Sequence, residues 1–174
     1  MHGTIEVHSS PGAGTTFHIQ LELDSVPATA NEQITLAEPL PDYAPLTGKH
    51  ILLCEDHPLN QEIAKTLLQE KGMIVVVAEN GQAGLEEFST SAPGYYDAIL
   101  MDIRMPVMDG YEATRQIRAL ERADAKKVPI IAMTADAFAE SVRKAEQAGM
   151  NRHLTKPVDP AKLYFVLQAS IGQG

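Results

Sequence analysis

A doubly wound α/β fold is predicted from two observations on this 174-residue chain. First, short apolar runs alternate five times with helical patterns between residue 49 and about residue 171. Second, polar side chains directly follow several of these runs. The alternation favours a parallel sheet with right-handed crossover helices on both faces. Because reactive groups in such sheets gather where strands end, we expect a functional site at the carboxyl edge.

Each element is predicted from its own pattern. The strand-like runs cover 50–54, 73–78, 97–101, 129–133 and 152–155, and the helical patterns cover 58–70, 81–89, 110–123, 137–148 and 160–171. The first helical segment places Leu59, Ile63 and Leu67 on one face, which is the spacing of an amphipathic helix. The expected arrangement is flavodoxin-like: a five-stranded parallel sheet of order 2-1-3-4-5 with five helices, and its switch point beside the first and third strands.

Two further segments precede this domain. In residues 1–23, Phe17, Ile19 and Leu21 alternate with polar residues after a turn rich in proline and glycine, so we expect a β-hairpin. A lone hairpin is marginal in water, so it is a fragment of a larger sheet or rests on something else. Residues 24–48 hold four prolines and no sustained period, which predicts an acidic, extended linker. The α/β domain is expected to cover 49–174.

Composition excludes several classes of function. The net charge is −9, and residues 1–48 contain six acids and neither lysine nor arginine, which argues against a nucleic-acid surface. We see no transmembrane helix, no signal peptide and no sign of membrane contact. The single cysteine, Cys54, lies in an apolar run, which excludes an internal disulfide and favours a reducing, cytoplasmic setting. A longer parent protein could still be membrane-anchored.

Three acids are expected to converge at the carboxyl edge. Glu55 and Asp56 follow the first strand, and Asp102 follows the third, which is its neighbour in the expected order. Carboxylates so close together repel, and a divalent cation relieves that repulsion. Mg²⁺ fits because it accepts a few carboxylates together with waters and phosphate oxygens. Taken alone, Asp56 could instead cap the helix that begins near Pro58.

Asp102 is also a candidate nucleophile toward phosphorus. Phosphoryl transfer needs in-line positioning and neutralisation of the equatorial oxygens. Mg²⁺ can neutralise one oxygen, Lys156 a second, and the hydroxyl of Thr134 can donate to a third. Each residue alone has a plainer interpretation: a surface charge for Lys156, and a turn residue for Thr134.

The chain resembles the receiver domain of two-component response regulators over residues 49–172. The residues that carry this resemblance are Glu55-Asp56, Met101-Asp102, Met105-Pro106, Asp109-Gly110, Thr134-Ala135 and Lys156-Pro157. It implies that Asp102 takes a phosphoryl group from a partner's phosphohistidine. It also implies Mg²⁺ bound by Asp56, Asp102 and the backbone carbonyl of Arg104, with Glu55 assisting through water, and a cis peptide between Lys156 and Pro157.

The same resemblance implies a switch pair. Thr134 fits the hydroxyl position, and the aromatic position maps onto His153, where tyrosine or phenylalanine is commoner. His153 could couple in a pH-dependent way or be a half-exposed strand residue. We also hypothesise an ion pair between Arg104 and Asp136 across the mouth of the pocket, which would control how readily water reaches the phosphoryl group.

The opening hairpin resembles the last strands of a histidine kinase ATP-binding domain, in which the segment with Gly12, Gly14 and Thr15 corresponds to a glycine box near the nucleotide. This implies the C-terminal piece of a hybrid sensor histidine kinase, without ATP-dependent kinase activity of its own. The expected partners are the kinase core and a histidine phosphotransfer protein, and the free hairpin edge leaves a homodimer open.

Three alternatives remain open at this point. The first is a stand-alone receiver that signals by phosphorylation-dependent protein binding. The second is an aspartate-nucleophile phosphatase of the haloacid dehalogenase type, although Asp102-Ile103-Arg104 lacks that family's second acid. The third is a degenerate receiver that serves only as a scaffold.

Overall fold

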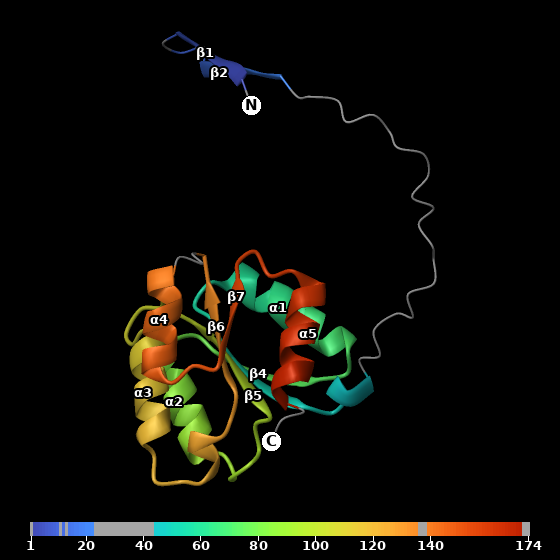
Figure 1. Ribbon diagram of the computed structural model, residues 1–174, viewed down its shortest axis with the longest axis vertical. Coiled ribbons are helices and arrows are strands. Elements are labelled where there is room, and N and C mark those ends of the chain that lie inside the picture. The colour runs from blue at the N-terminus through green and yellow to red at the C-terminus, as the bar shows by residue number, and fades with distance from the viewer. Residues whose placement is uncertain (1, 11, 13, 23–43, 136–138, 172–174) are drawn as a thin grey trace. The chain divides into compact units, whose positions relative to one another are not determined.

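The computed structural model describes residues 2–10, 12, 14–22, 44–135 and 139–171 (Figure 1). Two compact units divide the chain, residues 1–40 and residues 41–174. The helices of the described ranges include none long and apolar enough to cross a membrane.

The first unit is the predicted hairpin. Strands β1 (His2–Ser10) and β2 (Gly14–Glu22) pair antiparallel, with Ile5 opposite Ile19 and Val7 opposite Phe17. Strict alternation in both strands places these four apolar side chains on one face. All four are exposed, between 54% and 68%. The hairpin therefore presents an amphipathic surface whose apolar side is left uncovered by the residues of this unit that the structure describes.

The second unit confirms the predicted sheet. Its strands are β3 (His50–Cys54), β4 (Ile74–Ala78), β5 (Ala98–Asp102), β6 (Ile130–Thr134) and β7 (Arg152–Thr155). They pair in parallel in the spatial order β4-β3-β5-β6-β7, which is the order 2-1-3-4-5 of a flavodoxin-like fold. Strands β3, β5 and β6 are almost wholly buried, as expected for central strands covered on both faces.

Five helices cover the two faces of this sheet. They are α1 (Pro58–Glu70), α2 (Gly81–Thr90), α3 (Gly110–Ala119), α4 (Ala139–Ala148) and α5 (Pro160–Ile171). Figure 1 shows α2, α3 and α4 on one side of the sheet and α1 and α5 on the other. Two hydrophobic clusters correspond to these two layers: one contains Phe88 and Ile117, the other Leu68 and Leu163.

The unit begins earlier than residue 49. A 3₁₀ turn, η1 (Ala44–Leu46), lies within the range expected to be linker. Leu46 is fully buried and belongs to the same cluster as Ile51, Leu68 and Leu167. One side chain from the expected linker range is thus part of the core.

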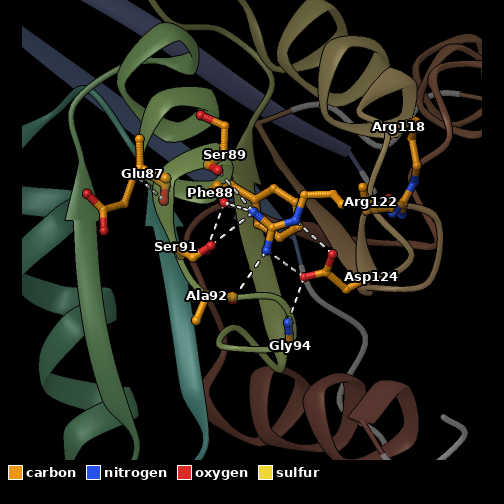
Figure 2. A network of polar contacts seen from close by, with 11 residues as sticks. Glu87, Phe88, Ser89, Ser91, Ala92, Gly94, Arg118, Arg122 and Asp124 are labelled. Atoms are coloured by element: carbon orange, nitrogen blue, oxygen red, sulfur yellow. Dashed lines mark hydrogen bonds and ion pairs between the residues drawn. The ribbon is translucent and has the colours of Figure 1, made fainter.

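The segment after α3 departs from the helical pattern. The pattern predicted helix to residue 123, but α3 ends at Ala119, Leu120 is extended, and a 3₁₀ turn η2 (Asp124–Lys126) follows. Arg122 holds this segment in place (Figure 2). Its guanidinium donates to the carbonyls of Phe88, Ser89, Ser91 and Ala92, pairs with Asp124 at 2.7 Å and lies over the Phe88 ring. The end of α2 and the turn after α3 are thereby joined at the amino-terminal edge of the sheet.

Candidate functional site

The candidate site lies at the carboxyl edge, where the strands end side by side. Glu55 and Asp56 follow β3, Asp102 ends β5, Thr134 ends β6 and Lys156 follows β7. Strand register aligns these ends: Cys54 is opposite Met101, Asp102 opposite Met133, and Thr134 opposite Thr155. The backbone N–H of Lys156 also donates to the carbonyl of Thr134 at 2.7 Å. Parallel pairing therefore gathers residues up to 101 positions apart in the sequence.

The three acids form a compact oxygen cluster. Carboxylate oxygens from Glu55, Asp56 and Asp102 all lie within 4.8 Å of one another. Glu55 is 1% exposed and Asp102 6% exposed, whereas Asp56 faces solvent. Two buried carboxylates with a third at the opening make a hard-oxygen donor set that fits a magnesium ion, leaving coordination positions for water and phosphate oxygens.

Lys156 supplies the positive charge of the site. Its ammonium group donates to Glu55 Oε2 at 2.5 Å and to Asp102 Oδ2 at 2.6 Å. One cation thus holds two buried carboxylates that would otherwise repel each other. The Lys156–Pro157 peptide bond that follows is cis.

The environment of Asp102 affects its ionisation. Burial raises the pKa of the Asp102 carboxyl above its ordinary value, and the hydrogen bonds from Lys156 and from the backbone N–H of Arg104 oppose this only in part. A further cation beside this carboxyl would favour its charged, nucleophilic form. The arrangement therefore suits a carboxylate that works together with a bound metal ion.

The loop after Asp102 is closed tightly onto the strand end. The N–H of Gly110 donates to the carbonyl of Ile103 at 3.0 Å, and a Cβ at Gly110 would overlap the carbonyl oxygen of Asp102. Asp109 caps α3, because its side chain accepts from the N–H of Glu112 at 2.8 Å. Only glycine fits at position 110, and this explains the Asp-Gly pair in the sequence.

Two amides of α1 complete the surroundings of Glu55 and were not anticipated. Asn60 donates to Glu55 Oε1 at 2.9 Å, and Gln61 donates to the Glu55 carbonyl oxygen at 2.6 Å. Their position in the first turn of the helix after the acid pair was the available signal, since a first turn lies directly above the preceding strand end. They hold the acid in place at the base of the site.

Three other predicted site residues differ in how exposed they are. Thr134 is buried at the site edge, 7% exposed, and Arg104 is exposed. His153 is exposed on β7 beside the small hollow between that strand and α4, which Val142 also lines. Asp136, the proposed partner of Arg104, lies outside the described residues.

Comparison with known proteins identifies the family. The sequence-family model of the response regulator receiver domain matches residues 51–168 of this chain. The chain therefore belongs to the response regulator receiver family.

The curated relatives are longer proteins. The hybrid signal transduction histidine kinase I of Dictyostelium discoideum is 38% identical over 123 residues, which cover 70% of this chain and 7% of that protein. The sensor protein EvgS of Escherichia coli is 35% identical over 164 residues, which cover 91% of this chain and 12% of that protein. The chain thus spans a small part of the relatives that it matches. A match over 91% of the chain necessarily reaches beyond the second unit into the hairpin.

Two solved structures are informative about the site. The receiver domain of sensor histidine kinase PA1611 from Pseudomonas aeruginosa, which carries a magnesium ion in its active site cleft, is 43% identical with a TM-score of 0.66. The match covers 73% of this chain and all of that chain. The receiver domain of Ssk1 from Saccharomyces cerevisiae, crystallised with the histidine phosphotransfer protein Ypd1, is 30% identical with a TM-score of 0.63, covering 71% of this chain and 89% of that chain.

Proposed function

We propose that this chain is the phosphoacceptor of a phosphorelay, in which Asp102 receives a phosphoryl group from a phosphohistidine. The observation that carries the proposal is the shared ammonium of Lys156, which contacts Asp102 and Glu55 inside a cluster of three carboxylates. Such a cluster holds a nucleophile, a cation and a metal-binding donor set within one pocket.

The transfer follows from these positions. An oxygen of Asp102 attacks the phosphorus, the P–N bond to the donor imidazole breaks, and the imidazole leaves as the neutral ring after taking up a proton. Lys156 neutralises one equatorial oxygen, and the Thr134 hydroxyl donates to another. Asp56, Asp102 and the carbonyl of Arg104 would hold Mg²⁺ directly, with Glu55 acting through water. When bound, the ion neutralises charge on the phosphoryl oxygens.

The acyl phosphate formed at Asp102 has two fates in this proposal. It passes to a histidine phosphotransfer protein, or water hydrolyses it. Thr134 would move toward the phosphoryl group, and His153 would move with it. This paired movement would signal that Asp102 is phosphorylated. An ion pair between Arg104 and Asp136 would slow the entry of water, and unchanged dephosphorylation in Arg104→Ala would contradict that part.

An apolar surface on α1, beside the pocket, is the docking site that we assign to a phosphotransfer protein. Leu59 and Ile63 on α1 are 62% and 47% exposed. Ile63 also lines a hollow that contains Glu55 and Lys156. Because a donor histidine has to reach Asp102, a partner that docks here covers this part of α1. The Ypd1 complex of a similar receiver supports a partner of this class.

The hairpin supports a hybrid kinase as the parent protein. We assign residues 1–23 to the end of an ATP-binding domain and 24–48 to the linker, and the exposed apolar face around Phe17 and Ile19 would be covered by that domain. The EvgS match into the hairpin favours this origin over a stand-alone receiver. A cytoplasmic location follows for this part of the parent.

Intact-mass measurement after incubation with Mg²⁺ and acetyl phosphate tests the proposal. We expect one added phosphoryl group, absent in Asp102→Asn and in EDTA. Asp109→Asn is the matched control, because asparagine also caps helices and the adduct should persist. An adduct that survives Asp102→Asn, or a wild-type protein that takes up neither phosphoryl group nor beryllofluoride, would contradict it.

A further inference from the structure

Val107 has an unusual backbone in the loop that follows Asp102. Its φ is +67°, the only positive φ of a non-glycine residue within the described ranges. The N–H of Met108 donates to the carbonyl of Pro106 at 2.7 Å, which closes a three-residue γ-turn centred on Val107. A γ-turn with positive φ is rare and strained, and a β-branched side chain is the least suited to it. Glycine or asparagine would adopt this conformation more readily.

The side chain of Val107 makes no packing contribution to the fold that would offset this strain. It is 84% exposed, the highest exposure of any large apolar residue in the described ranges. The turn itself is braced by backbone contacts, because the N–H of Gly81 donates to the carbonyl of Met108 at 3.1 Å. The isopropyl group of Val107 therefore contributes neither to the core nor to that brace.

Val107 lies within reach of any protein that delivers a phosphoryl group to Asp102. It is three positions from Gly110 in the sequence, so the two Cα atoms are at most about 11 Å apart. Gly110 itself abuts the backbone of Asp102. A specific protein interface covers about 800 Å² on each partner, a disc of about 16 Å radius. A footprint centred on Asp102 therefore includes Val107.

We propose that Val107 is a specificity-determining contact for the histidine phosphotransfer partner, whose surface beside the phosphohistidine buries the isopropyl group. This inference rests on the proposed function of Asp102 and adds a residue outside the reacting centre. The contact forms only when a protein donor docks, so a small donor gains nothing from it. Binding energy of this kind lowers KM for the protein donor and leaves the chemical step alone.

The test compares two donors on the full chain. Phosphorylated Ypd1 is the protein donor and acetyl phosphate the small donor, each with Mg²⁺. We expect Val107→Asn, which keeps a residue tolerant of positive φ, to lower the ratio of the two rates about tenfold, equivalent to about 1.4 kcal/mol. The loss should appear in KM for Ypd1. Val107→Ile, which keeps an apolar side chain, should have the same ratio of rates as the wild type.

Ile74→Thr is the matched control, since Ile74 is 48% exposed at the opposite edge of the sheet. An unchanged ratio in Val107→Asn, or an equal fall in Ile74→Thr, overturns the inference. A wild-type protein that acetyl phosphate labels but Ypd1 does not would also overturn it, with the acceptor role of Asp102 intact. Failure of acetyl phosphate to label Asp102 is a different result, which removes the proposed function itself.

Discussion

The ammonium group of Lys156 donates to Oδ2 of Asp102 at 2.6 Å, although the two residues are 54 positions apart in the sequence. The same ammonium contacts Glu55, so one lysine offsets part of the negative charge of two buried carboxylates. Its side chain is 18% exposed, which limits screening by water. Among the described residues, Lys156 is thus the cation that holds both acids together when no metal ion is bound.

We predict that Lys156→Gln destabilises the metal-free protein by about 2–4 kcal/mol, since removal of one partner leaves buried charge uncompensated. Mg²⁺ should restore much of this loss, so its stabilising effect should be larger in the variant than in the wild type. Urea unfolding with and without Mg²⁺ measures both effects. Lys49→Gln is the control, because its pair with Asp97 is more exposed and should contribute about 1 kcal/mol or less. Equal losses in the two variants would contradict the prediction.

The Arg122–Asp124 pair should make stability depend on acid pH. The hydrogen bond from Arg122 lowers the pKa of Asp124 to about 2, below its value in an unfolded chain. A carboxyl with a depressed folded pKa stabilises the fold above its unfolded pKa, and this contribution is lost as the pH falls from about 4 to 2. We expect Asp124→Asn to cost about 1–2 kcal/mol at neutral pH, after allowance for solvent screening.

The measurement for this prediction is the difference in unfolding free energy between wild type and Asp124→Asn across pH 7 to 3. The difference should shrink as the solution becomes more acidic. Glu112→Gln serves as control, because the ion pair of Glu112 with Arg115 on α3 is exposed. Its loss should hardly change the free energy of unfolding. A difference that stays constant down to pH 3 would show that the pair does not act through charge.

The thiol of Cys54 should be inert in the folded protein. Burial raises the pKa of Cys54 to about 12, and the thiol packs directly against Gly84, where a Cβ would overlap the sulfur. At pH 8 we expect a thiol reagent to modify Cys54 only at the rate of unfolding. Denatured protein provides the reference rate, and fast modification under native conditions would contradict the burial of this residue.

Leu46 should set the start of the stable domain. Because it is fully buried, Leu46→Ala should cost about 2–4 kcal/mol, and a chain that begins at residue 49 should lose a similar amount relative to one that begins at residue 44. Leu59→Ala, at a site that is 62% exposed, should change stability by only about 0.5 kcal/mol. Chemical unfolding of the four proteins gives the comparison, and equal stability of the two truncated chains would refute the role of Leu46.

Much of the fold was predictable because its signals are repeated. The strands and helices alternate with clear periods, and strand order places Glu55 beside Asp102 before any side chain is positioned. The same rule places Lys156 at this edge, although its hydrogen bonds to both acids were not predicted. These predictions depend on topology, which a pattern of elements encodes well.

Other features depend on single contacts that no period reveals. Leu46 is one of several apolar residues in a segment with no sustained period, so its burial has no local signature. The end of α3 at Ala119 reflects the contacts of Arg122 with a loop some 30 residues earlier in the sequence. The γ-turn at Val107 opposes local preference, since the residue type argues against the conformation that it adopts.

The contact between Gly110 and the carbonyl of Asp102 also has a mechanical consequence. With no side chain between them, the first turn of α3 packs directly against the main chain of Asp102. The start of α3 is also held by the backbone hydrogen bond from Gly110 to Ile103, which does not involve the Asp102 carboxylate. We therefore expect a change in charge on that carboxylate to act on the opposite side of the pocket, where Thr134 ends β6 and Lys156 follows β7.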